Sequence, residues 1–276
     1  MRVKSGLLLC AVFLSCIVVD AIGQPHVPPG PCCWPPTNRP AVNWWTFNGP
    51  SGTTSADLAG TFNNIGIDHG TIPRVGGSSF RAIQLQGAQW VQVANGNEVN
   101  FLGDCSTSNA ENGTIAFWIS ASPATGVVTL VDKRETSSNF IRGYSVFLWN
   151  GRLGFQMATG TGNGSCNSAG SACSNFIATS LPSVADGSWH FAAISFSRCN
   201  TPTGLFYVDG STAPFTPRTG SLANASDLFV GRNVPVLGTS NFTGLLDELA
   251  MFKFAYTKTE LDTLFNDHCH NQQCWF

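Results

Sequence analysis

The sequence has 276 residues, a net charge of −2 and 11% charged residues, whereas a soluble domain usually carries about 25%. A nucleic-acid partner is excluded because phosphate binding requires clustered Lys and Arg, and the sequence has no basic run. The hydrophobic residues make up 43% of the chain and the aromatic residues 11%, which is too apolar for intrinsic disorder. The composition therefore predicts a compact, aromatic-rich globular protein.

The first 23 residues have the layout of a secretory signal peptide. Arg2 and Lys4 form a short positive region, an apolar run extends to Val19, and Ala21-Ile22-Gly23 is a small-residue cleavage site. The apolar run is shorter than the roughly 20 residues of a membrane-spanning helix. We therefore expect no membrane span and a secreted, extracellular protein.

Eight cysteines remain after cleavage, and an even number in an oxidising compartment indicates up to four disulfides. A metal site around His268, Cys269, His270 and Cys274 is the alternative for the C-terminal group. The eight are Cys32, Cys33, Cys105, Cys166, Cys173, Cys199, Cys269 and Cys274. In an exported protein, four Asn-X-Ser/Thr sequons are expected to be glycosylation sites. They begin at Asn112, Asn163, Asn224 and Asn241.

The pattern changes after the proline-rich residues 24–40, whose seven prolines exclude a helix or a central strand. Ile115, Phe117 and Ile119 occupy alternate positions, which is the period of a strand. Similar runs predict strands at 81–85, 90–94, 127–132, 144–149, 153–158, 189–197, 205–208, 228–231 and 245–252. Asn150-Gly151 and Asp209-Gly210 are typical of type I′ hairpin turns. Many short strands of this kind predict an all-β sandwich or jelly roll.

One short C-terminal helix is expected at 258–266, with Leu261 and Leu264 on one face.

Residues 160–174 form a low-complexity loop. We interpret it as a surface loop closed by a disulfide, and the alternative is a specificity loop at the rim of a binding site. The chain thus divides into a signal peptide (1–23), a Pro/Cys-rich extended segment (24–40), one β domain (41–267) and a Cys-containing tail (268–276).

Five segments of the β domain, in order, resemble the laminin-G-like, concanavalin A-like jelly-roll family, which is related to the pentraxins. They are residues 43–48 (NWWTFN), 82–93 (AIQLQG…WVQV), 114–120 (TIAFWIS), 186–192 (DGSWHFA) with 205–210 (LFYVDG), and 242–252 (FTGLLDELAMF) with Tyr256-Thr257. The resemblance covers about residues 41–267. It implies a two-sheet antiparallel jelly-roll sandwich with one short C-terminal helix.

An enzyme is not expected. Glucanases with this fold place acidic residues as Glu-x-Asp-x-x-Glu on one strand, because glycoside hydrolysis needs two carboxylates in different roles. The sequence has no such run, and its adjacent Asp247 and Glu248 point to opposite faces of a strand. Neither a G-x-S-x-G nor an H-E-x-x-H motif is present.

The resemblance implies one structural Ca²⁺, held by Asp57 and Asp247 with Asn63 as a helper, because Ca²⁺ takes oxygen ligands from loops. The alternative gives Asp57 a loop-capping role and Asp247 a hydrogen bond inside the sandwich. For the disulfides, the closeness of the terminal strands in a jelly roll predicts that Cys32 and Cys33 pair with Cys269 and Cys274. Cys105–Cys199 and Cys166–Cys173 would complete the set.

Exposed aromatic rings on such a sandwich commonly stack on sugars. The candidates are Trp34, Trp44, Trp45 and Trp149. At most one of the adjacent Trp44 and Trp45 is expected in the inter-sheet core, and a core position is also expected for Trp90, Trp118 and Trp189.

His190 is interpreted as a sheet residue, and Lys133-Arg134-Glu135 as a solvated strand end. The sequence thus predicts a secreted, disulfide-stabilised binding module for glycans or extracellular glycoproteins. A structural matrix protein of a mineralised or cuticular layer is the alternative, and a glycan-active hydrolase is the third hypothesis.

Overall fold

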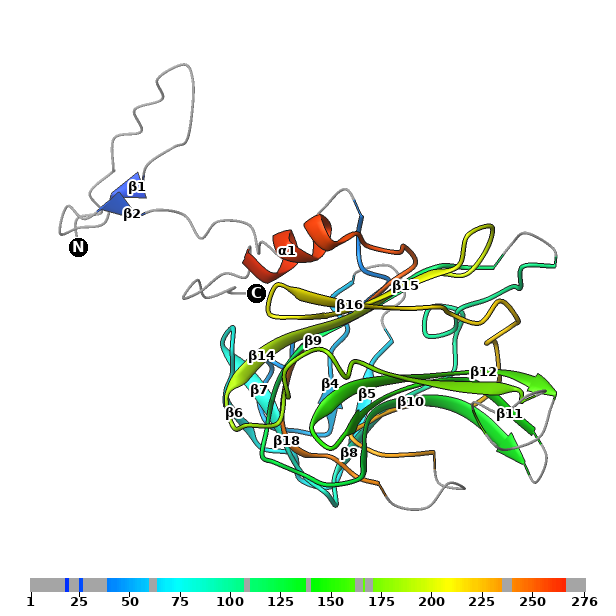
Figure 1. Ribbon diagram of the computed structural model, residues 1–276. Helices are drawn as coiled ribbons and strands as arrows, with labels where there is room; N and C mark the ends of the chain where they lie inside the picture. The colour runs from blue at the N-terminus through cyan, green and yellow to red at the C-terminus, as the bar shows by residue number, and fades with distance from the viewer. Residues whose placement is uncertain are drawn as a thin grey trace, which may run out of the picture.

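The structure is a computed structural model and describes residues 18–19, 25–26, 39–59, 64–106, 110–137, 140–161, 166, 171–234 and 240–266. Two antiparallel sheets, each of eight strands, pack face to face (Figure 1). A separate pair joins β1 (Val18–Val19) to β2 (Pro25–His26). The predicted jelly-roll sandwich is confirmed.

Sheet I carries the long hairpins of the middle of the chain. Its order is β13 (Cys173–Ile177), β12 (Arg152–Thr161), β11 (Phe140–Trp149), β10 (Val127–Ser137), β17 (Leu228–Val230), β8 (Trp90–Val93), β5 (Gly66–His69) and β4 (Thr54–Ser55). Neighbouring strands are mostly hairpin partners, and β17 joins the two halves of the sheet by pairing with β10 and β8.

Sheet II contains most of the segments that resemble the family, including strands from both ends of the β domain. Its order is β16 (Ser211–Phe215), β15 (Thr203–Val208), β14 (Trp189–Ser197), β9 (Gly113–Ala121), β18 (Thr243–Phe252), β7 (Arg81–Gln86) and β6 (Arg74–Gly76), with β3 (Asn43–Trp45) also paired to β18. A β-bulge interrupts the pairing of β18 with β9 between Asp247 and Ala250.

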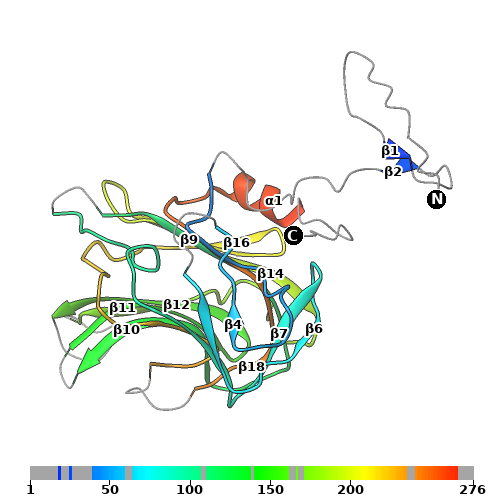
Figure 2. The ribbon, with the colours of Figure 1, turned by 180° about the vertical axis from the view of Figure 1, so that it is seen from behind.

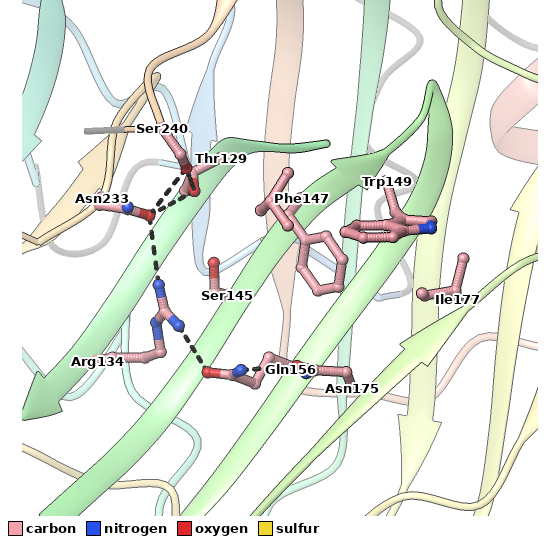
Figure 3. A pocket seen from close by; sticks show the side chains of 11 residues that line it. Thr129, Arg134, Ser145, Phe147, Trp149, Gln156, Asn175, Ile177, Asn233 and Ser240 are labelled. Atoms are coloured by element: carbon pink, nitrogen blue, oxygen red, sulfur yellow. Dashed lines mark hydrogen bonds between the residues drawn. The ribbon is translucent and has the colours of Figure 1, made fainter. Parts of the chain in front are cut away.

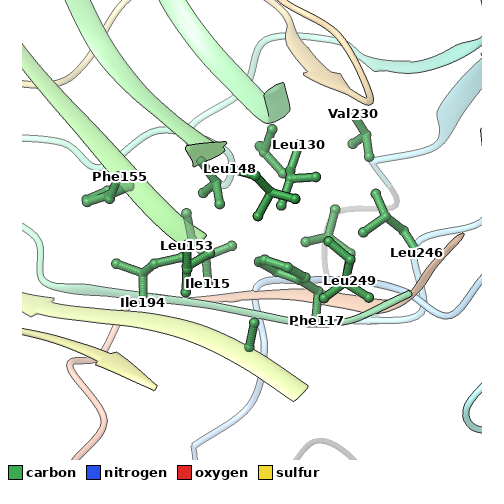
Figure 4. Packing of buried hydrophobic residues seen from close by; sticks show 14 of the residues in the cluster. Ile115, Phe117, Leu130, Leu148, Leu153, Phe155, Ile194, Val230, Leu246 and Leu249 are labelled. Carbon is green, nitrogen blue, oxygen red and sulfur yellow. The ribbon is translucent and has the colours of Figure 1, made fainter. Parts of the chain in front are cut away.

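The core lies between the two sheets because alternate residues of each strand point inward. Ile115 and Phe117 of β9 meet Leu148 of β11 and Phe155 of β12 in one buried cluster (Figure 4). Full burial of such a side chain contributes roughly 1.5–3 kcal/mol. The same alternation turns Ser145, Phe147 and Trp149 of β11 to the outer face of sheet I.

The helix α1 (Lys258–Asn266) covers the outer face of sheet II, away from sheet I (Figure 2). Thr257 and Glu260 form a capping box: Glu260 N–H donates to Thr257 Oγ1 over 3.3 Å, and Thr257 N–H donates to Glu260 Oε2 over 2.8 Å. Leu261 and Leu264 are buried against a second cluster that contains Trp118. The predicted helix is therefore confirmed at both of its ends.

Both predicted type I′ turns are present, since Asn150, Gly151, Asp209 and Gly210 all have positive φ. The predicted loop 160–174 is shorter than expected. Thr161 ends β12 and Cys173 begins β13, because the ladder Gly154–Ala158 continues onto Cys173–Ile177.

Two of the predicted disulfides are present, Cys105–Cys199 and Cys166–Cys173. Cys32, Cys33, Cys269 and Cys274 lie outside the described residues, so their pairing stays a prediction. Among the described residues, no helix is long and apolar enough to cross a membrane.

Candidate functional site

A cavity of about 510 Å³ lies on the outer face of sheet I, and we call it the sheet-face pocket (Figure 3). Strands β10 to β13 form its floor, and Asn233 and Ser240 border it from the connection between β17 and β18. Eleven described residues line it: Val127, Thr129, Arg134, Ser145, Phe147, Trp149, Gln156, Asn175, Ile177, Asn233 and Ser240.

One end of the pocket is apolar. Phe147, Trp149 and Ile177 gather there (Figure 3), and Trp149 is 42% exposed. The Asn150-Gly151 turn follows Trp149 directly, so this ring stands at the tip of the β11–β12 hairpin. Gly154 pairs with Phe147, and a Cβ at Gly154 would lie 2.6 Å from Phe147 Cζ. The absence of a side chain at Gly154 therefore lets the Phe147 ring lie flat on the sheet.

The other end of the pocket is organised by a buried ion pair. Arg134 Nε donates to Asp132 Oδ1 and Arg134 Nη2 to Asp132 Oδ2, both over 2.6 Å. The side-chain exposure is 10% for Arg134 and 0% for Asp132. Asp132 Oδ2 also accepts the Val234 N–H over 3.0 Å, which fixes the connection after β17 onto the sheet. Charge-assisted bidentate bonds of this kind set the guanidinium orientation.

Arg134 in turn orients the amide and hydroxyl groups of the pocket. Its Nη1 donates to Gln156 Oε1 over 2.6 Å, and Gln156 Nε2 donates to Asn175 Oδ1 over 2.6 Å. On the other side, Asn233 Oδ1 accepts from Arg134 Nη2 over 3.4 Å and from Thr129 Oγ1 over 2.5 Å. These bonds form one continuous chain across the polar end of the pocket (Figure 3).

The arrangement suits recognition of a ligand with one apolar face and several hydroxyl groups. Exposed aromatic carbon stands beside fixed amides and hydroxyls, which is the lining expected of a small-molecule site. None of the eleven described lining residues is a carboxylic acid, so the pocket itself offers no pair for general acid and base chemistry.

The predicted sugar-binding role of Trp44 and Trp45 is wrong because both rings are buried. Trp45 is 1% exposed in the inter-sheet core, and its indole N–H donates to Asn64 O over 2.9 Å. Trp44 is 8% exposed in the cluster beneath α1, and its indole N–H donates to Glu248 Oε2. Only one of the two lies in the inter-sheet core, as expected. Trp34 lies outside the described residues.

Three further tryptophans were expected in the core, and the outcome is mixed. Trp118 is buried, but in the cluster under α1, and Trp189 is only partly buried against that cluster. Trp90 is also partly exposed, with its ring stacked on His69 at 4.7 Å and covered by Arg232 at 4.3 Å. Its faces are thus occupied by protein groups, which excludes Trp90 as a sugar platform.

The two described calcium candidates have different surroundings. Asp57 accepts four hydrogen bonds, from Asn43 Nδ2 and from the backbone N–H groups of Trp44, Ala59 and Asn64. A carboxylate has about four lone-pair positions, so Asp57 caps its loop and does not fit the role of a calcium ligand in this arrangement.

Asp247 is fully buried and accepts the Ser79 N–H over 3.0 Å, while its Oδ1 has no hydrogen-bond partner. Burial raises the pKa of this carboxyl to about 7. Asn63 lies outside the described residues. In the part of the chain that the structure describes, no three His, Cys, Asp or Glu side chains form a metal-binding group. Calcium binding stays a prediction, with a rise in melting temperature in millimolar Ca²⁺ as its test.

The described sequons differ in what their amide nitrogen does. Asn224 Nδ2 donates to Lys133 O over 2.9 Å, to Leu222 O over 3.1 Å and to Arg142 O over 3.3 Å, and Asn241 Nδ2 donates to Gly87 O. Asn112 instead uses its side-chain oxygen, which accepts the Arg198 N–H. Asn163 lies outside the described residues. Glycosylation stays a prediction, and the geometry favours Asn112.

His190 lies at the start of β14 as predicted, between two carboxylates. Its Nδ1 is 2.6 Å from Asp209 Oδ2 and its Nε2 is 2.9 Å from Asp186 Oδ1. Burial lowers the pKa of His190, but the two carboxylates outweigh it and the pKa is raised. Both ring nitrogens are within hydrogen-bond distance of a carboxylate, so His190 holds the Asp209-Gly210 turn against β14. Neither ring nitrogen is left for proton transfer to a ligand.

The ion pair at the polar end of the pocket was not predicted from the sequence. The interpretation of Lys133-Arg134-Glu135 as a solvated strand end is wrong for Lys133 and Arg134, whereas Glu135 is exposed. Lys133 is fully buried and Arg134 is 9% exposed. One signal was available: Asp132 and Arg134 are two residues apart in a strand, and therefore share a face, in a sequence with few charges.

The comparisons agree with this architecture. A family model described as the Concanavalin A-like lectin/glucanases superfamily matches residues 85–262, which is more than half of the chain. No curated protein sequence is significantly similar to the chain.

Solved structures share the fold at low sequence identity. The binding domain of Paraclostridial Mosquitocidal Protein 1 has a TM-score of 0.59 at 18% identity, and the binding domain of Botulinum Neurotoxin DC in complex with SialylT has 0.59 at 16%. These matches cover 83% and 84% of this chain and 52% of each binding domain, so the chain spans about half of their length. Domain 4 of a GH43 extracellular arabinanase from Geobacillus stearothermophilus, in complex with arabinotriose, has a TM-score of 0.57 at 18% identity, over 82% of this chain and 98% of that domain.

Proposed function

The chain belongs to the Concanavalin A-like lectin/glucanases superfamily, and we propose that it binds glycans or the glycan part of glycoproteins through the sheet-face pocket. The observation that carries the proposal is the division of the pocket into an aromatic end and an amide-rich end. A sugar ring has the matching chemistry, because its C–H face packs on an aromatic ring while its hydroxyls accept and donate hydrogen bonds.

The fold neighbours support a glycan as ligand in general terms. The arabinanase domain is described in complex with arabinotriose, and cell entry of botulinum neurotoxin type C is described as dependent on interaction with two ganglioside molecules. At 14–18% identity these proteins share the fold with this chain. The assignment to this pocket therefore rests on its own lining.

In this proposal the protein is secreted and binds without hydrolysing. Secretion rests on the N-terminal signal sequence and agrees with the two disulfides. Binding without hydrolysis rests on the pocket lining, which contains no carboxylic acid among the described residues. Asp132, the acid paired with Arg134, has a fully buried side chain that is held by that cation. A polysaccharide panel tests this part: release of reducing ends by the purified protein would overturn it.

The test of binding compares two aromatic truncations on a glycan panel. Trp149→Ala removes the exposed ring of the pocket, whereas Phe80→Ala removes a ring of similar exposure, 45% against 42%, outside the pocket. Stacking of a nucleobase on an aromatic side chain is worth roughly 1–3 kcal/mol. A stacking contact of similar size with a sugar predicts that Trp149→Ala weakens glycan binding at least about fivefold. Phe80→Ala should leave it unchanged. If the wild-type protein binds no glycan of the panel, the proposal fails and a structural matrix role is favoured.

A further inference from the structure

We infer that the sheet-face pocket selects uncharged glycans and discriminates against sialylated, sulfated and uronic-acid-containing ones. The inference rests on the proposed glycan-binding function and adds the ligand class. It comes from the charges around the pocket and from what each charged group already binds.

Arg134 is the only charged residue among the eleven described lining residues. An arginine in a sugar pocket ordinarily indicates a carboxylate or sulfate ligand, because its guanidinium matches those groups in two-point hydrogen bonds. Here that two-point contact is already made by Asp132, at 2.6 Å for each bond. Gln156 accepts from Arg134 Nη1 and Asn233 accepts from Arg134 Nη2, so four of the five guanidinium N–H groups already have partners.

The counter-charge is permanent in the fold. Asp132 has a fully buried side chain and also accepts the Val234 N–H, so it cannot swing aside to let a ligand anion replace it. Arg134 and Asp132 together bring no net charge to the pocket. A ligand carboxylate entering beside Arg134 would lose its water and gain no unpaired cation, and burying such a charge is costly.

A neighbouring cavity carries negative charge. It has a volume of about 450 Å³ and shares Arg134 with the sheet-face pocket, and its lining includes Glu135 and Asp227 but no cation besides Arg134 among the described residues. Lys133, the remaining cation of β10, is fully buried and donates its Nζ to Asn95 Oδ1 and Asn224 Oδ1, both over 3.0 Å. These acids disfavour an anionic ligand that extends past Arg134.

Arg232, which precedes Asn233, is not among the described residues that line the pocket. Its guanidinium lies 4.3 Å from the centre of the Trp90 ring, and its Nε donates to Asn233 O over 3.0 Å. Apart from one N–H of the paired Arg134, the groups left to contact a ligand are hydroxyls, amides and apolar carbon. Such groups recognise neutral sugars by shape and hydroxyl pattern.

The test uses matched glycans that differ only in charge. Neutral arabino-, xylo-, manno- and gluco-oligosaccharides and a lactose series are titrated beside the same backbones carrying one uronic acid, sulfate or sialic acid. We expect neutral members to bind at least about tenfold more tightly than their charged partners. We also expect binding of the neutral members to be unchanged between about 50 and about 500 mM NaCl, because no ion pair forms with the ligand.

An Asp132→Asn variant provides the converse experiment. It leaves Arg134 without its counter-charge, so affinity for the charged members should rise about tenfold and become salt-dependent. The control is Asp262→Asn, which removes the ion-pair partner of Lys258 on α1, on the outer face of sheet II and far from the pocket. It should leave the affinity for neutral and charged glycans unchanged. Because Asp132→Asn also disturbs a buried ion pair, the wild-type ranking and salt dependence serve as a measurement that does not depend on the folding of this variant.

The two levels of the hypothesis fail differently. Preference of the wild-type protein for charged members overturns the selectivity for neutral glycans and leaves glycan binding intact. Binding of neither series removes the proposed function itself.

Discussion

Replacing Arg134 by Met should destabilise the protein strongly, because it leaves a carboxylate buried without its cation. Asp132 is fully buried and would keep only the Val234 N–H. Removing one partner of a buried ion pair costs about 3–5 kcal/mol, and the lost bonds to Gln156 and Asn233 act in the same direction. With a denaturant slope of about 3 kcal/mol per M, a loss of about 4 kcal/mol lowers the urea midpoint by about 1.3 M.

The measurement is urea unfolding followed by tryptophan fluorescence, with two comparisons. Lys258→Met breaks a pair with exposed side chains, 51% and 34%, and should cost less than about 0.5 kcal/mol. The double variant Asp132→Val/Arg134→Met replaces both charges by apolar groups and should recover most of the loss, since such replacements are often neutral or stabilising. A single variant that costs less than about 1 kcal/mol, or a double variant as unstable as the single one, would refute the reasoning.

Three further predictions concern other parts of the molecule. His190→Gln should flatten the pH dependence of the free energy of unfolding, because carboxylates raise the pKa of His190 in the folded state. The stabilisation by His190 is complete below its ordinary pKa of 6.5 and is lost as the pH rises through the raised value. Urea midpoints of the wild-type protein and the variant at several pH values measure this difference. Removing the Cys105–Cys199 disulfide with two Ala substitutions should cost about 4–5 kcal/mol, because it closes a loop of 94 residues; an unchanged melting temperature would contradict this. Gly154→Ala should push the Phe147 ring into the pocket, since the new Cβ would lie 2.8 Å from Cδ2, and calorimetry should find weaker glycan binding with the fold retained by circular dichroism.

The sequence predicted the strands and turns well because their signals are local. The period of two in 115–119, the Asn-Gly and Asp-Gly turns and the capping-box helix each depend on a few neighbouring residues. The interpretation of Trp44 and Trp45 failed because their burial depends on tertiary contacts. Alternation correctly placed them on opposite faces, but it could not show that α1 covers the outer face of sheet II and buries Trp44 as well.

The pocket could not be predicted, apart from Trp149, because its parts come from distant positions. Arg134 contacts Asn233 across 99 residues and Gln156 across 22, and only the order of strands in sheet I brings these side chains together. The charge pattern at 132–134 indicates a shared face, but not that the connection after β17 covers it and removes water.

By itself, then, the sequence determined the all-β sandwich, its hairpins, its helix and its family, since hydrophobic period and turn chemistry are properties of short segments. The tertiary structure decided which aromatic ring stays exposed and that Arg134 is neutralised by Asp132. It also decided that Asp57 serves its own loop. These outcomes depend on which surfaces become buried against each other, and burial sets the free energy of every charge and ring that they contain.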